Sequence, residues 1–197
     1  MRPAWLMLCG VLAVGSAGAW VSGNPPSWLW HAATWQQQPW TVFTASFVHL
    51  SAAHLLGNLL ALAALALLGQ ALRAGVASAL ALLAAWPLAT VALQLWPAIS
   101  SYGGVSLVAH AGVAVLAVHC ALRPREVRAA RLWALLLVAG LAVKLIAERA
   151  WQQPLLFDGA WGFKVAVAAH LSGALAGLAC ALLAAGAAAW VVRRPVP

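Results

Sequence analysis

Apolar residues in this chain are gathered into long runs, and most polar residues are confined to the short connections between them. A helix of about 20 apolar residues is long enough to cross the hydrocarbon core of a bilayer. The pattern therefore predicts an all-α, polytopic membrane protein with six spans, folded as one domain over residues 1–197. The predicted spans are residues 4–22, 50–70, 75–96, 104–121, 132–150 and 163–191.

Three segments need separate interpretation. The fourth run is short and follows Pro97 and two glycines, so we expect it to begin below the membrane surface, after a re-entrant loop. The connection 23–48 is rich in tryptophan and lacks charge, which predicts an interfacial segment in the outer leaflet rather than a plain exposed loop. The first run follows Arg2 as in a secretory signal, but we predict an uncleaved first helix because the bundle needs it.

Composition supports the membrane assignment and argues against other classes. The 197 residues are 65% hydrophobic and 7% charged, whereas ordinary soluble domains carry about 25% charged residues. The formal net charge of +8 could indicate nucleic-acid binding. The basic residues are sparse, however, and lie at the ends of apolar runs, so we predict membrane orientation and no nucleic-acid partner. Three cysteines lie inside apolar runs without a pairing or metal-binding pattern and are predicted to be packing residues.

The distribution of positive charge predicts the orientation in the membrane. Most basic residues of a six-span chain would fall on one side, and cytoplasmic loops are the ones enriched in Lys and Arg. Both termini are therefore predicted to be cytoplasmic, and the starts of the fourth and sixth helices are predicted to face the outside. The basic residues on the predicted cytoplasmic side are Arg2, Arg73, Arg123, Arg125, Arg128, Arg131, Arg193 and Arg194.

Polar side chains inside the apolar runs form three short elements. Such side chains are costly in hydrocarbon and usually have a function. A hydroxyl, a distant imidazole and a His/Asn pair are the components of a serine hydrolase. The elements are His49-x4-His54-x3-Asn58, Gly104-Val105-Ser106 and Ala169-His170-Leu171-Ser172-Gly173.

The serine and the distant histidine can form a nucleophile and base. Ser106 is predicted to open the fourth helix, where a Gly104 turn and unpaired backbone N–H groups could stabilise an oxyanion; the alternative is a simple helix cap. His170 is predicted about seven residues into the last helix, where it could take the serine proton or serve as a core histidine. No Asp or Glu is placed to orient it, so we predict a Ser–His dyad. Gly173 and Gly177 would let this helix approach the serine helix closely.

The His/Asn element is predicted to supply hydrogen-bond donors. His54 and Asn58 are four residues apart and share one helical face, from which both can donate to a developing oxyanion. His49 lies nearer the surface and is expected to hold the first loop. A metal site is the competing interpretation, but His49 and His54 do not share a face and no carboxylate is nearby. We therefore predict neither a metal nor a cofactor.

These motifs, in this order on successive spans, resemble the rhomboid family of intramembrane serine proteases. The similarity covers the second to sixth spans. It implies a six-helix rhomboid-like bundle with Ser106 as nucleophile, His170 as base, and an oxyanion hole from His54, Asn58 and the Ser106 backbone. It also implies transmembrane protein substrates and lipid contact, in a bacterial inner membrane with the site toward the periplasm.

The chain departs from the family pattern at two positions beside the serine. Leu107 follows Ser106 where the family usually has glycine, which could narrow the site or indicate an inactive relative. His110 stands where bacterial members often have a tyrosine stacked on the catalytic imidazole. Because His110 shares a helical face with Ser106, we expect it to stack on His170 or to bond near it.

The fifth span resembles that of one subgroup. Lys144 and Glu148 are similar to the Lys/Glu pair of rhombosortases, which process proteins with a C-terminal Gly-Gly sorting tail. The resemblance implies that the pair contributes to substrate recognition. The alternative is a self-neutralising ion pair that reaches toward the outer surface.

Three other functions stay open at this point. The protein could be a general rhomboid protease with different clients, or a catalytically inactive relative that binds membrane proteins. It could also be a small transporter or channel in which His170, Lys144 and Glu148 form a proton path. Serine reactivity would separate the proteases from the other two.

Overall fold

The structure is a computed structural model that describes residues 3–123, 128–159 and 161–193. Six long helices fall close to the six predicted spans, which confirms the polytopic all-α bundle. Five apolar helices in the described ranges are long enough to cross a membrane, and α5 is shorter. The long helices are α1 (Pro3–Val21), α3 (Ala52–Ala71), α4 (Val76–Ala92), α5 (Ser106–Leu122), α6 (Ala130–Glu148) and α7 (Val167–Arg193).

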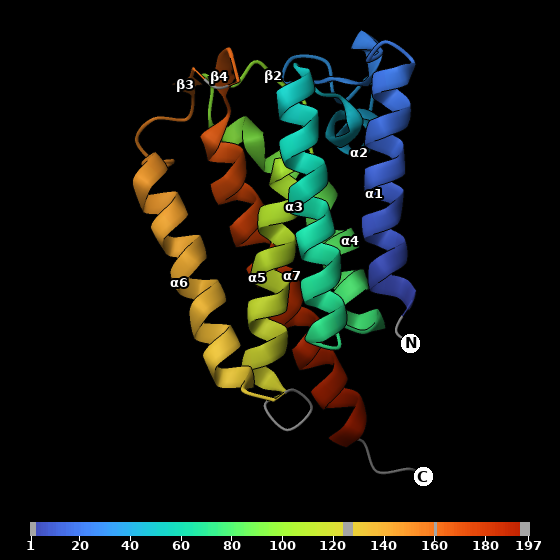
Figure 1. Cartoon of the computed structure of the whole chain (residues 1–197), viewed down its shortest axis with the longest axis vertical. Helices are drawn as coiled ribbons and strands as arrows, with labels where there is room; N and C mark the ends of the chain where they lie inside the picture. The colour runs from blue at the N-terminus through green and yellow to red at the C-terminus, as the bar shows by residue number, and fades with distance from the viewer. Residues whose placement is uncertain (1–2, 124–127, 160, 194–197) are drawn as a thin grey trace.

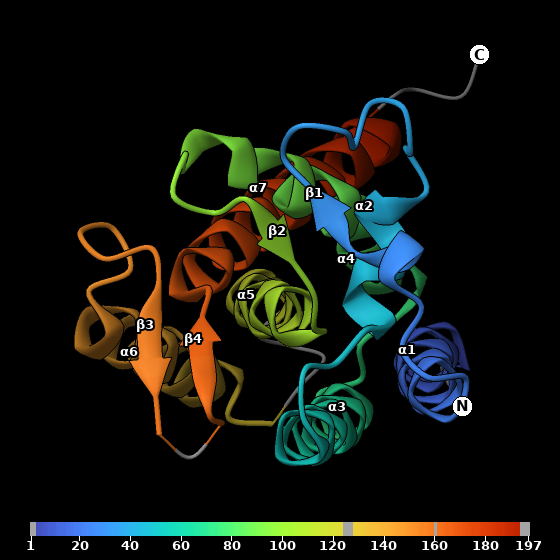
Figure 2. The same ribbon diagram turned by 90° about the horizontal axis from the view of Figure 1, so that it is seen from above.

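Helix α5 occupies the centre of the bundle, with α3, α4, α6 and α7 packed around it (Figure 2). The closest approach is between α5 and α7. A β-carbon at Gly173 would collide with the Leu107 carbonyl, and one at Gly177 with the Ala111 carbonyl. The predicted contact between these glycines and the serine helix is thus confirmed. Close backbone packing of this kind holds helices together where lipid removes the usual hydrophobic driving force.

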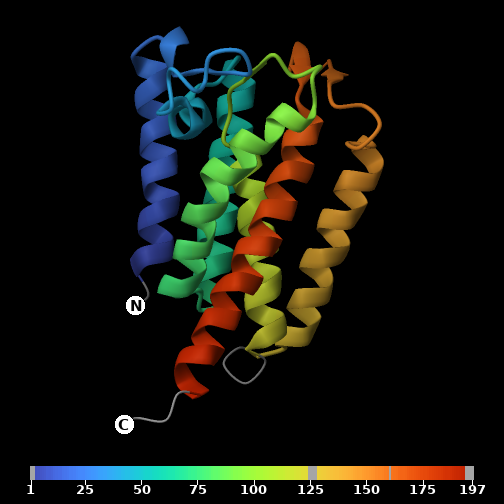
Figure 3. The ribbon, with the colours of Figure 1, turned by 180° about the vertical axis from the view of Figure 1, so that it is seen from behind.

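Helix α6 lies at the edge of the bundle (Figures 1 and 3). Only 11% of the residues in its most apolar stretch are buried in the protein, against 50% for the corresponding stretch of α4 and the turn that follows it. Its leucine and valine side chains are largely exposed, as expected for a helix that faces lipid. Three of its residues are buried: Ala130, Ala134 and Glu148. Glu148, the one charged residue among these three, therefore faces the interior of the bundle from α6, the helix with the smallest buried share.

The connection between α1 and α3 is folded against the bundle. It contains η1 (Pro26–Trp28), β1 (Trp30–His31), α2 (Thr41–Thr44) and η2 (Ala45–Phe47). Strand β1 pairs antiparallel with β2 (Ser101–Tyr102), and the Trp86 indole donates to Ser46 Oγ at 2.9 Å. Trp30 is fully buried. The alternative interpretation of this connection as a plain exposed loop is therefore wrong, while its contact with the outer leaflet stays a prediction.

A short β-hairpin precedes the last helix. Strand β3 (Leu156–Asp158) pairs antiparallel with β4 (Phe163–Val165). The predicted start of the last span at residue 163 is wrong, because residues 163–165 are extended and α7 begins at Val167. His170 consequently lies in the first turn of α7 rather than deep within it. Elsewhere in the chain, a 3-10 turn, η3 (Leu93–Leu95), follows directly after α4 and precedes β2.

The two ends of the bundle differ in charge. The start of α1 and the end of α7 lie at the same end, opposite the strands (Figures 1 and 3). The connections between α3 and α4 and between α5 and α6 lie at this end too, so Arg73, Arg123, Arg128 and Arg131 gather there. Arg2, Arg125 and Arg194 lie outside the described residues. Arg149, which follows α6, lies at the other end. The predicted asymmetry is therefore confirmed as an excess of arginine among the described residues at the end where α1 begins and α7 ends, and the cytoplasmic location of this end stays a prediction.

Candidate active site

Ser106 is the first residue of α5 and follows a tight turn. Gly104 has a positive φ of 127°, which side chains rarely tolerate, and a β-carbon there would lie 2.8 Å from the His54 ring. The turn is closed by Tyr102, whose hydroxyl donates to Gly104 O at 2.6 Å and accepts from Leu107 N at 3.1 Å. Burial raises the pKa of Tyr102 to about 12, so the hydroxyl stays protonated.

His170 contacts the serine directly. Its Nε2 lies 3.2 Å from Ser106 Oγ, across the close contact between α5 and α7. The imidazole is buried, whereas Ser106 is half-buried and faces two cavities. The serine and histidine that the motifs singled out are therefore brought together by the fold, and a proton can pass between their side chains.

Glu148, the last residue of α6, lies on the other side of the His170 ring. Its two carboxylate oxygens are 3.0 and 2.9 Å from His170 Nδ1, and Oε1 also lies 2.8 Å from Lys144 Nζ. The prediction that no carboxylate is placed to orient His170 is therefore wrong. The error arose because the contact depends on how α6 is rotated about its axis, which the sequence pattern does not determine.

His110 stacks on His170, as predicted from its helical position. The two ring centroids are 4.1 Å apart and the planes differ by 11°. His110 Nδ1 lies 2.7 Å from Ser106 O, and a carbonyl can only accept, so this nitrogen donates. The stack limits rotation of the His170 ring out of its plane.

His54 and Asn58 line one wall of a cavity together with Ser106. Leu50 N donates to His54 Nδ1 at 3.4 Å, so the proton of the neutral ring is on Nε2. Among the described residues, Asn58 Nδ2 is buried without a hydrogen-bond partner. Two donors are thus available at this wall, and a buried donor without a partner is costly unless a ligand uses it.

His49 supports the first loop, as predicted, and does not contact Ser106. Its Nδ1 lies 3.0 Å from Phe47 O, and Asn24 Nδ2 donates to His49 O at 2.7 Å. Burial lowers the pKa of His49, which favours the neutral ring. The described residues contain no group of three side chains that could hold a metal ion.

Two cavities flank Ser106. One, of about 210 Å³, lies between β2 and β4 and includes His54. The other, of about 220 Å³, lies between α3 and α6 and includes Lys144 and Glu148. Leu107 lines neither of them, because it is fully buried in the core. The expected narrowing of the site by Leu107 is therefore not observed.

The β3–β4 hairpin contributes two aromatic side chains that the sequence reasoning missed. The Trp161 and Phe163 rings lie 5.6 and 5.1 Å from the His54 ring, measured between centroids. Trp161 also lies against Gly57 of α3, where no larger residue would fit without displacing it. These contacts place the hairpin over the cavity. The hydroxyl bridge that Tyr102 forms across the turn was also missed, although the position of Tyr102 just before two glycines was an available signal.

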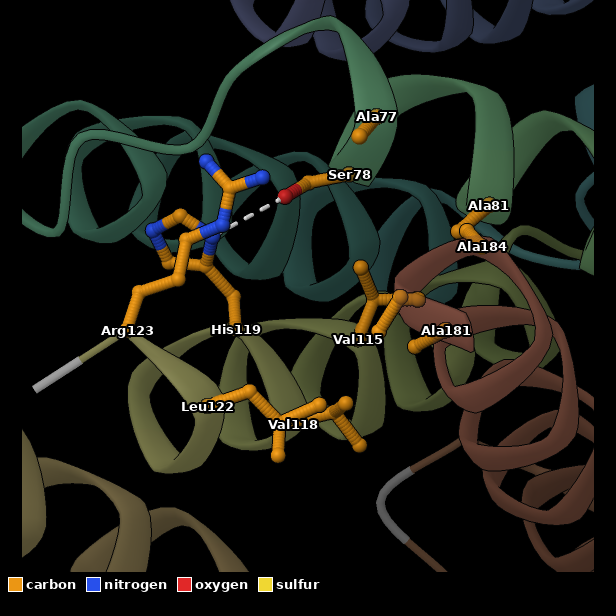
Figure 4. A pocket seen from close by; sticks show the side chains of 11 residues that line it. Ala77, Ser78, Ala81, Val115, Val118, His119, Leu122, Arg123, Ala181 and Ala184 are labelled. Carbon is orange, nitrogen blue, oxygen red and sulfur yellow. Dashed lines mark hydrogen bonds between the residues drawn. The ribbon is translucent and has the colours of Figure 1, made fainter. Parts of the chain in front are cut away.

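A second Ser–His contact lies at the opposite end of the bundle (Figure 4). Ser78 Oγ is 3.3 Å from His119 Nδ1, and His119 Nε2 is 2.9 Å from Leu72 O. The associated pocket holds only about 40 Å³ and is lined largely by alanine, valine and leucine, with Arg123 at its edge. This pair links α4 and α5 to the end of α3.

Comparison with known proteins gives the same family as the motifs. The family model of the Rhomboid domain matches residues 36–187, which is more than half of the chain. No curated protein matches the sequence. Members of this family are in general intramembrane serine proteases that act on transmembrane substrates, and some members are inactive. With six long helices, the domain match and the Ser106–His170 contact on central helices, the chain belongs to the rhomboid family of multi-pass membrane proteins.

Proposed function

We propose that the protein is an active intramembrane serine endopeptidase with Ser106 as nucleophile and His170 as general base. The observation that carries this proposal is the 3.2 Å contact between Ser106 Oγ and His170 Nε2 beside a cavity that the donors of His54 and Asn58 also line. An inactive relative would need neither the contact nor the donors. Retention of both supports hydrolysis over passive client binding.

The reaction follows from the positions of these atoms. Ser106 Oγ attacks the scissile carbonyl carbon while His170 Nε2 takes the hydroxyl proton. His54 Nε2, Asn58 Nδ2 and the Ser106 backbone N–H stabilise the oxyanion, each such donor being worth on the order of 3 kcal/mol. His170 then gives its proton to the leaving amine. Water attacks the acyl-enzyme with His170 again as base, which restores the Ser106 hydroxyl.

The substrate is proposed to bind as an extended segment of a single-span membrane protein. Strand β2 pairs with β1 and strand β4 with β3, and β2 and β4 are the inner strands above α5 (Figure 2). The 210 Å³ cavity lies between β2 and β4 and reaches Ser106. An extended peptide can add to a free strand edge through main-chain hydrogen bonds, which would present its backbone to Ser106.

The finer proposal is a C-terminal Gly-Gly sorting tail, as in rhombosortases. Trp161 and Phe163 crowd His54 from above, and the cavities beside Ser106 are small. A segment without side chains fits such a space most easily. We also propose that the protein lies in a bacterial inner membrane, with both termini cytoplasmic and the site toward the periplasm, because Arg73, Arg123, Arg128 and Arg131 gather at the end opposite the site.

Reporter cleavage tests both levels of the proposal. A reporter with a Gly-Gly tail, one span and a basic end is coexpressed with wild type, Ser106→Ala or His170→Ala, with Ser78→Ala as the matched serine control. Cleavage by wild type and Ser78→Ala alone supports the protease and the tail. Labelling of Ser106 by a fluorophosphonate without reporter cleavage keeps the protease and rejects the tail. Absence of both in folded protein rejects the protease.

A further inference from the structure

We propose that Glu148 is a positioning residue that turns the Ser106–His170 pair into a Ser–His–Glu triad, with Lys144 as the counter-ion of the carboxylate. This inference rests on the proposed function. It differs from a role in substrate recognition, because it directs the carboxylate at His170 rather than at the substrate.

The first argument is the hydrogen-bonding chemistry of the ring. An ionised carboxylate only accepts hydrogen bonds, and both Glu148 oxygens lie within 3.0 Å of His170 Nδ1. The Nδ1 proton is therefore fixed on that side of the ring. Nε2 is left with a lone pair, which is what it needs to accept the Ser106 proton at 3.2 Å. The other tautomer would put a proton on Nε2 and block this transfer.

The second argument is a division of roles between His110 and Glu148. His110 stacks on the face of His170 and uses its own Nδ1 on the Ser106 carbonyl. A stacked ring restrains the plane of His170 but does not distinguish its two nitrogens. Glu148 contacts the edge of the ring at Nδ1, and so it does distinguish the two nitrogens. The two residues therefore control different degrees of freedom.

The third argument concerns charge during the reaction. When Ser106 loses its proton, the Oγ–H bond breaks and an Nε2–H bond forms, so His170 becomes an imidazolium. The adjacent carboxylate stabilises that cation without taking the Nδ1 proton. The proton later leaves from Nε2 to the departing amine, and His170 returns to neutral. Glu148 stays ionised throughout.

Lys144 explains how a carboxylate can persist in this location. The Glu148 side chain is only 10% exposed, and an isolated buried charge in an apolar helix is costly. Lys144 lies one turn earlier on α6, with Nζ 2.8 Å from Glu148 Oε1 and a side chain that is 53% exposed. It can neutralise the carboxylate while reaching water. A purely structural ion pair would explain this contact but not the pair of contacts to His170.

The test is the rate at which a fluorophosphonate labels Ser106 in the full-length protein in lipid nanodiscs. This rate depends on the activated serine and requires no knowledge of the natural substrate. We expect Glu148→Ala and Glu148→Gln to lower it about 10²–10⁴-fold, with Glu148→Asp retaining an intermediate rate. Added formate should partly restore Glu148→Ala, because a small carboxylate can enter the vacated space. Formate should have no effect on Ser106→Ala.

Two further variants separate positioning from structural support. Arg149→Gln changes the exposed neighbour of Glu148 and should label at the wild-type rate. Lys144→Met removes the ion pair but keeps the carboxylate beside His170, so its loss should be smaller than that of Glu148→Ala. Equal losses in Lys144→Met and Glu148→Ala, or a Glu148→Ala rate that formate does not raise, would overturn the triad. If wild type is not labelled, the proposed function itself fails.

Discussion

The two Ser–His pairs of this protein have almost the same contact distance and very different surroundings. Ser106 Oγ lies 3.2 Å from His170, and Ser78 Oγ lies 3.3 Å from His119. Both serines are in the first turn of a helix and both histidines are buried. A helix N-terminus and a neighbouring imidazole are therefore common to the two pairs. Neither feature distinguishes a reactive serine from an unreactive one.

The differences lie in what the second ring nitrogen and the serine oxygen face. His170 has a carboxylate at Nδ1, whereas His119 Nε2 lies against the Leu72 carbonyl. Ser106 adjoins cavities of about 210 and 220 Å³ with two hydrogen-bond donors, whereas the pocket at Ser78 holds about 40 Å³. Space for a substrate and donors for an oxyanion, more than the Ser–His contact, mark a hydrolytic site.

The largest expected difference between the pairs is in serine reactivity. Ser106→Ala removes the proposed nucleophile, and we expect reporter cleavage to fall by about 10⁴-fold or more. Ser78→Ala removes one structural hydrogen bond and should leave cleavage per folded molecule at the wild-type level. Initial rates normalised to folded protein measure both. Equal activity in the two variants would contradict the assignment of Ser106.

The next effect concerns the proposed oxyanion donors, His54 and Asn58. Asn58→Ala removes a buried donor that has no partner among the described residues, so little stability should be lost with it. We expect kcat to fall about 10²–10³-fold with KM nearly unchanged, because the interaction forms only in the transition state. Steady-state kinetics on the reporter separate the two constants. A rise in KM at constant kcat would instead assign Asn58 to ground-state binding.

A smaller effect is expected at the turn before Ser106. Tyr102→Phe removes a hydroxyl that bridges Gly104 O and Leu107 N, and both groups would lose a buried partner. We expect a loss of about 1–3 kcal/mol in stability and a lower cleavage rate from a looser turn. Thermal unfolding and reporter kinetics of the same preparation test this. Unchanged values for both would show that the turn holds without the bridge.

The smallest catalytic effect is expected from the second pair itself. His119→Leu removes the contacts to Ser78 and Leu72, which join α3, α4 and α5 at the end far from Ser106. Stability should fall by about 1–3 kcal/mol, while cleavage per folded molecule stays constant. Thermal unfolding monitors the first quantity and normalised kinetics the second. A loss of kcat in folded His119→Leu would reveal coupling between the two ends.

The sequence predicted well those features that depend on local pattern. Six apolar runs predicted six helices, because about 20 consecutive apolar residues suffice to specify a span. His54 and Asn58 were placed on one face by their spacing alone, and the Gly173 contact followed from residue size. These inferences required no knowledge of how distant elements meet.

The features that the sequence did not predict depend on tertiary placement. The β3–β4 hairpin consists of two short strands whose pairing has no strong pattern, so β3 was assigned to a connection and β4 to the start of the last span. The contact between Glu148 and His170 requires that α6 be rotated toward α7. The bridging role of Tyr102 was not predicted, because its two hydrogen bonds exist only once the turn around Gly104 has formed. Short strands, helix rotation and turn chemistry thus limited the prediction.

The position of Glu148 on α6 links two properties of the site. One cavity beside Ser106 lies between α3 and α6, and α6 is the least enclosed of the helices compared above. Any outward displacement of α6 that widened this cavity would also draw the carboxylate away from His170. Access and reactivity would then vary in opposite directions. In such a bundle, Ser106 would be less reactive while α6 is displaced to admit a client and would regain its reactivity once α6 has returned.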